Sequence, residues 1–163
     1  MNLEKFKSNF IILQKNSKKA INRKNVSFPN EEIGNYIHSG YNLGLLSKSD
    51  FIFIDMDKSE NINGIKNFSK WCSDNEIDFN LLKEKTLIQK TPSGGMHMIF
   101  LKPKNCDFKY NISLLEGVDI IGNPNSYIVI DPSKTEKGKY SLINSNQQPV
   151  EISSNLLSKI TQK

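Results

Sequence analysis

The chain has few of the residues that cross-link small proteins or build zinc sites. It contains 2 Cys in 163 residues, Cys72 and Cys106, and no C-x-x-C pair. A disulfide framework or a zinc ribbon is therefore not indicated. Together with His38 and His97 the cysteines could supply four zinc ligands, but their spacing fits no recognised zinc site. Buried thiols are the better interpretation.

Long apolar runs and the common nucleotide-binding loops are also missing. No run is long enough to cross a bilayer, and residues 1–7 lack the apolar stretch of a secretory signal. Neither GxxxxGK[ST] nor GxGxxG occurs, which excludes P-loop and Rossmann sites. We expect a soluble, cytoplasmic protein with no membrane partner.

Arginine is the scarcest of the charged residues. The chain has 22 Lys plus Arg, only one of them arginine, against 17 Asp plus Glu, which gives a net charge of +5. Lysine is a point charge without the two-pronged geometry of arginine, so it suits phosphate attraction better than base reading. The charge is compatible with a polyanionic partner.

The length and composition predict a single folded domain over residues 1–163. Hydrophobic residues make up 37% and charged residues 24%, values typical of globular proteins. Apolar periodicity predicts helices between Asn30 and Gly40, through 65–72 and over 153–160. The predicted strands lie at 10–13, 42–47, 51–55, 87–90, 98–101, 118–121, 127–130 and 140–143.

Short connections join most of these strands. We expect hairpins between 42–47 and 51–55, between 87–90 and 98–101, and between 118–121 and 127–130. The strand 51–55, Phe-Ile-Phe-Ile-Asp, should be central and buried on both faces. The fold class is therefore mixed α/β, of the α+β kind, with a sheet built mostly from hairpins.

Asp55-Met56-Asp57 ends that central strand. Residues two apart in an extended chain point to the same side, so the two carboxylates should project together. Two carboxylates this close repel each other unless a cation lies between them, and Mg²⁺ or Mn²⁺ prefers such oxygen ligands. A strand end whose acids face water is an equally good interpretation of this motif alone.

Two further motifs follow it along the chain. Ser93-Gly94-Gly95-Met96-His97 leads into the strand 98–101, and its glycines allow close backbone approach to a ligand such as phosphate. On its own, His97 is more simply a buried structural histidine. Gly117-Val118-Asp119-Ile120 places an acid at the start of another apolar strand. If that strand lies beside Asp55, three carboxylates converge and could hold two metal ions.

Taken in order, the three motifs resemble those of the archaeo-eukaryotic primase superfamily, in its bifunctional primase/polymerase (prim-pol) branch. The order is D-x-D after an apolar strand, a small residue followed by x-His, and hydrophobic-Asp. Residues 42–45 before the first motif, and 131–133 with 138–140 after the third, also fit this branch, and 15–19 is similar to its basic N-terminal loop. The resemblance covers residues 10–145.

The resemblance implies an RRM-like catalytic core with a smaller N-terminal α/β portion. It also implies a role for each residue that matches a motif. Asp55, Asp57 and Asp119 would bind two Mg²⁺ or Mn²⁺ ions, and His97 would hold the triphosphate of the incoming nucleotide. The additional nucleotide-binding candidates are Ser93, Gly94, Gly95, Lys90 and Ser133, and the lysines that could attract the template are Lys18, Lys19, Lys102 and Lys104.

The expected function is that of a metal-dependent, template-directed nucleotidyltransferase acting on a DNA template and primer with NTP or dNTP. It would serve DNA replication, for example that of a mobile element. The chain shows neither the helical or zinc-bearing appendage nor the helicase that often accompanies this domain. We therefore expect it to extend a primer, or to prime with the help of a separate helicase or accessory protein.

Two other functions compete with this one. The first is a catalytically inactive primase-like module that binds nucleic acid or nucleotides beside a replication partner. The intact acids argue against it, since a decayed site should lose at least one. The second is a nucleotide-sugar glycosyltransferase, which also uses D-x-D with a metal. Those enzymes usually need a larger doubly wound region than this chain offers.

Overall fold

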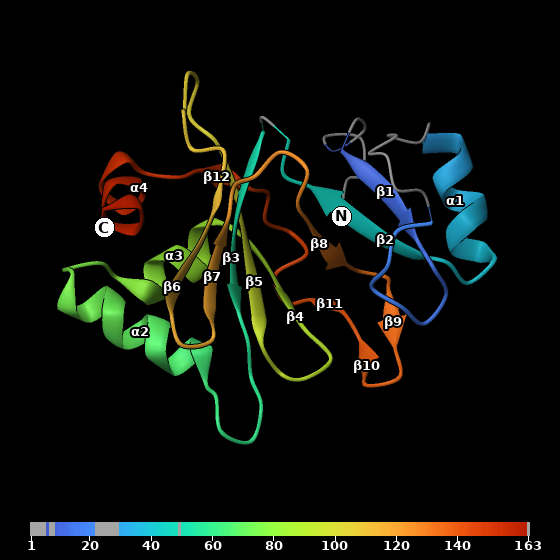
Figure 1. Cartoon of the computed structure of the whole chain (residues 1–163), viewed down its shortest axis with the longest axis horizontal. Helices are drawn as coiled ribbons and strands as arrows, with labels where there is room; N and C mark the ends of the chain where they lie inside the picture. The colour runs from blue at the N-terminus through green and yellow to red at the C-terminus, as the bar shows by residue number, and fades with distance from the viewer. Residues whose placement is uncertain (1–5, 7–8, 22–29, 49, 163) are drawn as a thin grey trace.

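The computed structural model describes residues 6, 9–21, 30–48 and 50–162. Within these residues, four helices and twelve strands form a mixed α+β fold built mostly of antiparallel strand pairs (Figure 1). The expected mixed α+β fold class is thus confirmed. One large sheet occupies the centre of the molecule, with helices on one side and a small sheet on the other.

The large sheet has the strand order β11-β4-β5-β3-β7-β6. Its neighbours along that path are all antiparallel, and β12 pairs in parallel with the last part of β5. As predicted, β3 lies in the middle of the sheet and is almost wholly buried. The strands are β3 (Phe51–Met56), β4 (Leu87–Lys90), β5 (Met96–Leu101), β6 (Asn111–Leu115), β7 (Val118–Ile121), β11 (Ser141–Leu142) and β12 (Val150–Glu151).

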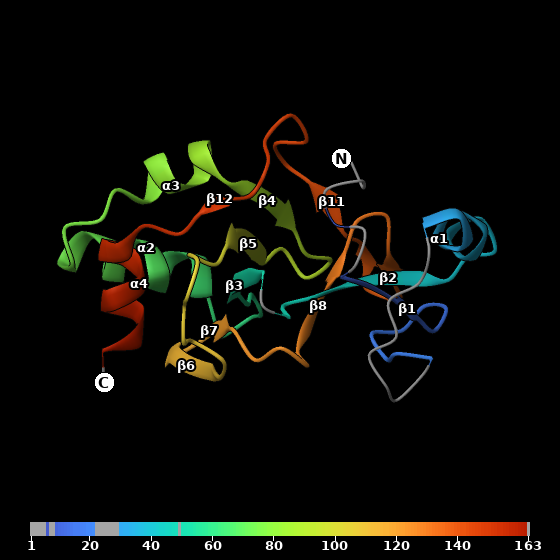
Figure 2. The same cartoon turned by 90° about the horizontal axis from the view of Figure 1, so that it is seen from above.

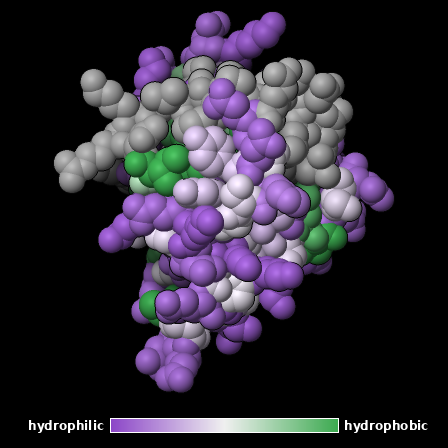
Figure 3. All heavy atoms as spheres, turned by 90° about the vertical axis from the view of Figure 1, so that its right-hand side faces the viewer, coloured by the Kyte–Doolittle hydropathy of each residue, from purple (hydrophilic) through white to green (hydrophobic). Residues whose placement is uncertain are grey.

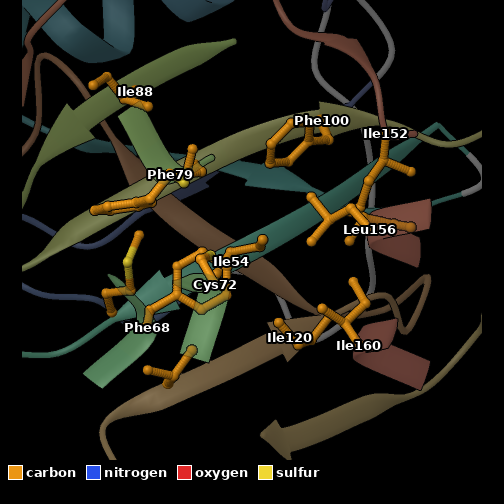
Figure 4. Close-up of a cluster of buried hydrophobic side chains, with 14 of the residues drawn as sticks. Ile54, Phe68, Cys72, Phe79, Ile88, Phe100, Ile120, Ile152, Leu156 and Ile160 are labelled. Atoms are coloured by element: carbon orange, nitrogen blue, oxygen red, sulfur yellow. The ribbon is translucent and has the colours of Figure 1, made fainter. Parts of the chain in front are cut away.

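Helices α2 (Gly64–Asp74), α3 (Phe79–Lys85) and α4 (Ser154–Thr161) cover one face of this sheet (Figures 1 and 2). Each begins at a side-chain cap, Asn63, Asp78 or Ser153, whose oxygen accepts a hydrogen bond from a backbone N–H in the first turn. Their apolar faces meet alternate residues of the strands in one core (Figure 4). This core includes Ile54, Phe68, Cys72, Phe79, Ile88, Met98, Phe100, Ile120, Leu156 and Ile160.

The opposite face of the large sheet is partly covered by the small sheet. The small sheet has the order β1-β2-β8, with β1 (Phe10–Leu13), β2 (Asn42–Leu46) and β8 (Tyr127–Ile130), and α1 (Asn30–His38) packs beside β2. The two sheets share a second apolar core, which includes Phe10, Leu43, Leu45, Phe51, Phe53, Leu87, Ile99, Ile128 and Ile130. The strands β9 (Lys134–Thr135) and β10 (Gly138–Lys139) form a separate short hairpin.

Two of the three expected hairpins are wrong. β2 and β3 belong to different sheets, and so do β7 and β8. Between β2 and β3, the Phe51 N–H donates to the Ser47 carbonyl at 2.9 Å and the Ser47 hydroxyl to the Phe51 carbonyl at 2.6 Å. This closed turn carries the chain from one sheet to the other instead of folding it back. The expected hairpin of β4 with β5 is confirmed.

Some elements were not predicted from the sequence. α3, β6 and β12 are short, and β6 is polar and exposed at alternate positions, so none carries a strong apolar period. The hairpin partner of β7 was predicted to be β8. The antiparallel neighbour of β7 is instead β6, and β8 pairs with β2.

The surface at the small-sheet end is mostly hydrophilic. In the space-filling view of that end, the hydrophobic side chains of the described residues form only separate small patches (Figure 3). Among the described residues, no helix is both long and apolar enough to span a membrane.

Backbone contacts between two glycines hold the start of α2 against the start of β7. A Cβ at Gly64 would lie 2.0 Å from the Gly117 carbonyl oxygen, so a side chain there must push the two segments apart. We expect Gly64→Ala to lower the free energy of unfolding by about 1–3 kcal/mol, the usual cost of overpacking. Chemical denaturation measures this change.

Gly34→Ala in α1 is the matched control. No atom of the described residues lies within 4 Å of its Cβ position, so alanine should add about 0.5–1 kcal/mol through helix propensity. Equal effects of the two substitutions would contradict the close contact at Gly64.

Candidate active site

Polar side chains form a row across the large sheet, on the face that meets the small sheet. In the strand register, Asp55 on β3 pairs with His97 on β5 and with Asp119 on β7. Neighbouring residues in register point to the same face of a sheet. The predicted convergence of the three carboxylates requires β7 to lie beside β3. The structure has this pairing.

Asp57 follows the end of β3 and is held by its backbone. Its N–H donates to the Gly117 carbonyl at 2.8 Å, and its carbonyl accepts from the Gly64 N–H at 2.8 Å. These bonds tie the residue to the start of β7, two residues before Asp119, and to the first turn of α2. Asp57 is one of the residues that line a pocket.

That pocket has a volume of about 440 Å³ and is bordered by four loops. They are the basic loop after β1, the loop between β3 and α2, the β4–β5 turn and the β9–β10 hairpin. Asp57, Tyr140 and three lysines from different loops, Lys18, Lys58 and Lys137, are among the residues that line it. The lysines suit an anionic ligand, and the carboxylate suits a metal ion. The pocket therefore suits an anion that carries a bound metal ion.

The electrostatics of the site are dominated by the acids. Burial raises the pKa of Asp57 above its ordinary value, and the carboxylates of Asp55 and Asp119 raise it further, while Lys18 and His97 act in the opposite direction. Burial, with the charges of Asp55 and Asp57, also raises the pKa of Tyr140 to about 12. Burial and the neighbouring carboxylates thus disfavour the ionised form of Asp57 more than the nearby cations favour it.

The residues present fit a divalent cation. Oδ1 of Asp55 is buried and accepts no hydrogen bond from the described residues, although His97 Nε2 lies 3.2 Å away. An unbonded carboxylate oxygen beside two further carboxylates calls for a positive ligand. Among the described residues, no three His, Cys, Asp or Glu side chains are yet close enough together to hold a metal ion. The carboxylates of Asp55, Asp57 and Asp119 thus lie in one region of the sheet but do not surround a common point.

His97 is buried, with 6% of its side chain exposed, and is held from behind by Gln89 on β4. The two residues are paired in the strand register, and Gln89 Nε2 lies 2.7 Å from His97 Nδ1. The same amide bonds to the small sheet: Nε2 donates to the Val129 carbonyl at 2.6 Å, and Oε1 accepts from the Asp131 N–H at 3.1 Å. Gln89 thus joins His97 to the second sheet.

The predicted glycine turn packs against the end of β3. A Cβ at Gly95 would lie 2.3 Å from the Met56 carbonyl oxygen, and Gly94 has φ +87°. The close approach that the glycines allow is therefore to the strand that carries Asp55. Ser93, the first residue of this turn, lines the pocket.

Lys90 and Ser133 lie apart from the acids. Lys90 is exposed at the end of β4 and pairs in register with Met96, in the row that faces the helices. Ser133 is 1% exposed, and its hydroxyl bonds to both the N–H and the carbonyl of Leu43. Ser133 therefore holds the segment that follows β8 against β2. The nucleotide contacts of Lys90 and Ser133 remain predictions.

The lysines expected to attract a template also differ in place. Lys18 lines the pocket, whereas Lys102 is 9% exposed and its ammonium donates to the carbonyls of Lys48 and Gly122. Burial lowers the pKa of Lys102. Lys102 therefore braces two loops, and Lys104 remains on the surface.

Sequence reasoning did not find Gln89, Tyr140, Lys58 or Lys137. One feature of the sequence could have indicated Gln89. It lies two residues after Leu87 in the same strand, and so on the same face, which is expected to be apolar. A polar residue at such a position needs partners. The pocket lysines left no signal, because lysine is frequent throughout the chain.

The raised pKa of Asp57 predicts a stability change with pH. A carboxyl group whose pKa is higher in the folded state stabilises the fold below its unfolded pKa, and this contribution is lost as pH rises through the folded pKa. Without divalent ions, Asp57→Asn should therefore raise the melting temperature near neutral pH, and the gain should vanish below the ordinary value of 3.8.

Thermal unfolding at several pH values measures this effect, with the exposed Glu84→Gln on α3 as control. Mg²⁺ or Mn²⁺ should raise the melting temperature of the wild type and have less effect on Asp57→Asn. A variant less stable than the wild type at neutral pH would contradict the crowding of negative charge at Asp57.

Comparison with known protein families agrees with this arrangement. The family description Bifunctional DNA primase/polymerase, N-terminal (Prim-Pol) matches residues 13–155, which extends beyond the expected 145 at the C-terminal side. The curated proteins contain no significant match. The matched range contains β3, β5 and β7 with their acids and histidine, and the chain belongs to the Prim-Pol N-terminal domain family.

Proposed function

We propose that the chain is a metal-dependent, template-directed nucleotidyltransferase of the DNA primase/polymerase type. One observation carries the proposal: Asp55, Asp119 and His97 lie in register on three adjacent strands, beside a pocket lined by Asp57 and three lysines. Family membership supports the same activity.

Asp55, Asp57 and Asp119 would hold Mg²⁺ or Mn²⁺, in a two-metal site. Such ions activate a primer 3′ hydroxyl and stabilise the pyrophosphate leaving group. The acids supply only oxygen ligands, as these hard ions prefer, and Asp55 Oδ1 has no hydrogen bond to give up. The backbone bonds of Asp57 to Gly64 and Gly117 keep its carboxylate at the pocket edge.

The pocket would hold the triphosphate of the incoming NTP or dNTP. Its lysines, Lys18, Lys58 and Lys137, come from three loops and can surround a polyphosphate without reading a base. His97 would donate a hydrogen bond to the phosphates, with Ser93 beside it. Catalysis would then consist of positioning and charge neutralisation at the α-phosphate.

The DNA template and primer are the macromolecular partners of this proposal. The large sheet would be the RRM-like core implied by the family resemblance, and α1 with the small sheet its N-terminal portion. A separate helicase or accessory replication protein would supply strand opening, in the replication of a mobile element or another DNA.

A primer-extension assay tests the activity. We expect incorporation that requires Mg²⁺ or Mn²⁺, and we expect Asp55→Asn, Asp119→Asn and Asp57→Ala each to lower it by about two orders of magnitude or more, because each removes charge that stabilises the transition state. NTP and dNTP are compared with each metal, on primed and unprimed templates.

Asp74→Asn is the matched control, since Asp74 is exposed on α2 and pairs only with Lys70 in the ion pairs that the described residues form. Thermal unfolding shows that each variant is folded. Normal extension by Asp57→Ala would remove the acids from the mechanism. Binding of primer–template or nucleotide by the wild type without incorporation in either metal would indicate the inactive binding module.

A further inference from the structure

The nitrogen atom of His97 that carries the proton is determined by its contact with Gln89. The Gln89 amide is buried, with 0% exposure, and its orientation is set by two backbone groups. The Val129 carbonyl can only accept, so it faces Nε2, and the Asp131 N–H can only donate, so it faces Oε1. A flipped amide would lose both bonds.

With the amide in this orientation, a donor faces the imidazole. Nε2 of Gln89 has two hydrogens; one goes to Val129, and the other points to His97 Nδ1 at 2.7 Å. Nδ1 must therefore be the acceptor, and in the neutral ring the proton lies on Nε2. A proton on Nδ1 would place two N–H groups against each other.

This arrangement is the reverse of that around a metal-binding histidine. A histidine that binds metal usually donates its second N–H to a carboxylate, a carbonyl or water, which leaves the other nitrogen free for the ion. In this protein the group behind His97 is a donor, and the nitrogen that faces Asp55 carries the hydrogen. His97 can donate to an anion beside the acids but has no lone pair to offer a cation there.

We propose that Gln89 is a positioning residue that holds His97 in the Nε2–H tautomer and so makes it a hydrogen-bond donor to phosphate rather than a metal ligand. The tautomer follows from the contacts alone, and its use toward phosphate rests on the proposed function. His97 Nε2 lies 3.2 Å from Asp55 Oδ1 without hydrogen-bond geometry, so a phosphate oxygen can replace this contact and accept from the N–H.

Nitrogen NMR of the ¹⁵N-labelled wild-type protein tests the tautomer directly. The chain has 2 His, and the His38→Gln variant, altered at an exposed position of α1, identifies the signals of His97. We expect a protonated, pyrrole-type Nε2 and an unprotonated, pyridine-type Nδ1, with a scalar coupling from Nδ1 to the Gln89 amide nitrogen across the hydrogen bond. The opposite tautomer, or no coupling, would overturn the proposal.

Two substitutions test the positioning role. Gln89→Met keeps the approximate length without a donor, and the tautomers of His97 should then mix. Gln89→Glu replaces the donor by an acceptor and should move the proton to Nδ1. Gln147→Met, the same change at an exposed glutamine, should leave the His97 signals unchanged. An unaltered tautomer in a folded Gln89→Met would overturn the role of Gln89, and where neither variant folds the wild-type coupling decides.

The kinetic readout separates positioning from simple support of the fold. We expect Gln89→Met to raise the nucleotide KM roughly 10- to 100-fold, by analogy with the loss of a group that orients a metal-binding histidine, with primer–template affinity unchanged. Equal loss of both would overturn the positioning role. If the wild type incorporates no nucleotide, the proposed function fails, while the NMR spectrum still decides the tautomer.

Discussion

The site depends on the antiparallel register of β4, β5, β3 and β7. That register places Gln89, His97, Asp55 and Asp119 in one row and sends the residues on either side of them, such as Ile54 and Met98, into the helix-covered core. A slip of one residue in any of these strands would turn its polar side chain toward the helix-covered core: a carboxylate from β3 or β7, the amide from β4 or the imidazole from β5. The apolar cores on both faces oppose such a slip, so the packing that stabilises the sheet also assembles the polar row.

The same two-sided packing explains which parts were predictable. The buried strand β3, the β4–β5 hairpin and the capped helices α2 and α4 each have a strong local pattern, and each was predicted near its observed range. The alternation of Asp55 and Asp57 also predicted carboxylates on one side. What the sequence could not show is which sheet a strand joins, because β2 and β8 are as apolar as β3. Two crossovers between sheets were therefore interpreted as hairpins.

Residues that work through a contact far along the chain were also beyond prediction. Gln89 contacts Val129, which lies 40 positions away in the sequence. No residue near Gln89 in the sequence predicts the carbonyl that orients its amide. Tyr140 and the pocket lysines come from separate segments: the loop after β1, the loop between β3 and α2, the β9–β10 hairpin and the residue that follows it. The acid and histidine motifs could be predicted because each lies next to an apolar strand; their supporting groups could not, because those are defined only by the tertiary structure.

The orientation of His97 and the crowding of the acids impose opposite requirements on a ligand. In the proposed site, Asp55 Oδ1 accepts no hydrogen bond from the described residues and would bind a cation, whereas the proposed N–H on His97 Nε2 would bind an anion. A metal ion alone would satisfy only the first requirement, and the N–H of His97 would repel it. A phosphate alone would satisfy only the second, and the carboxylates would repel it. A metal-bound polyphosphate satisfies both at once, because its cation faces the acids and its oxygens face the histidine and the lysines. For the proposed function, this complementarity would favour joint binding of metal and nucleotide over stepwise binding of either.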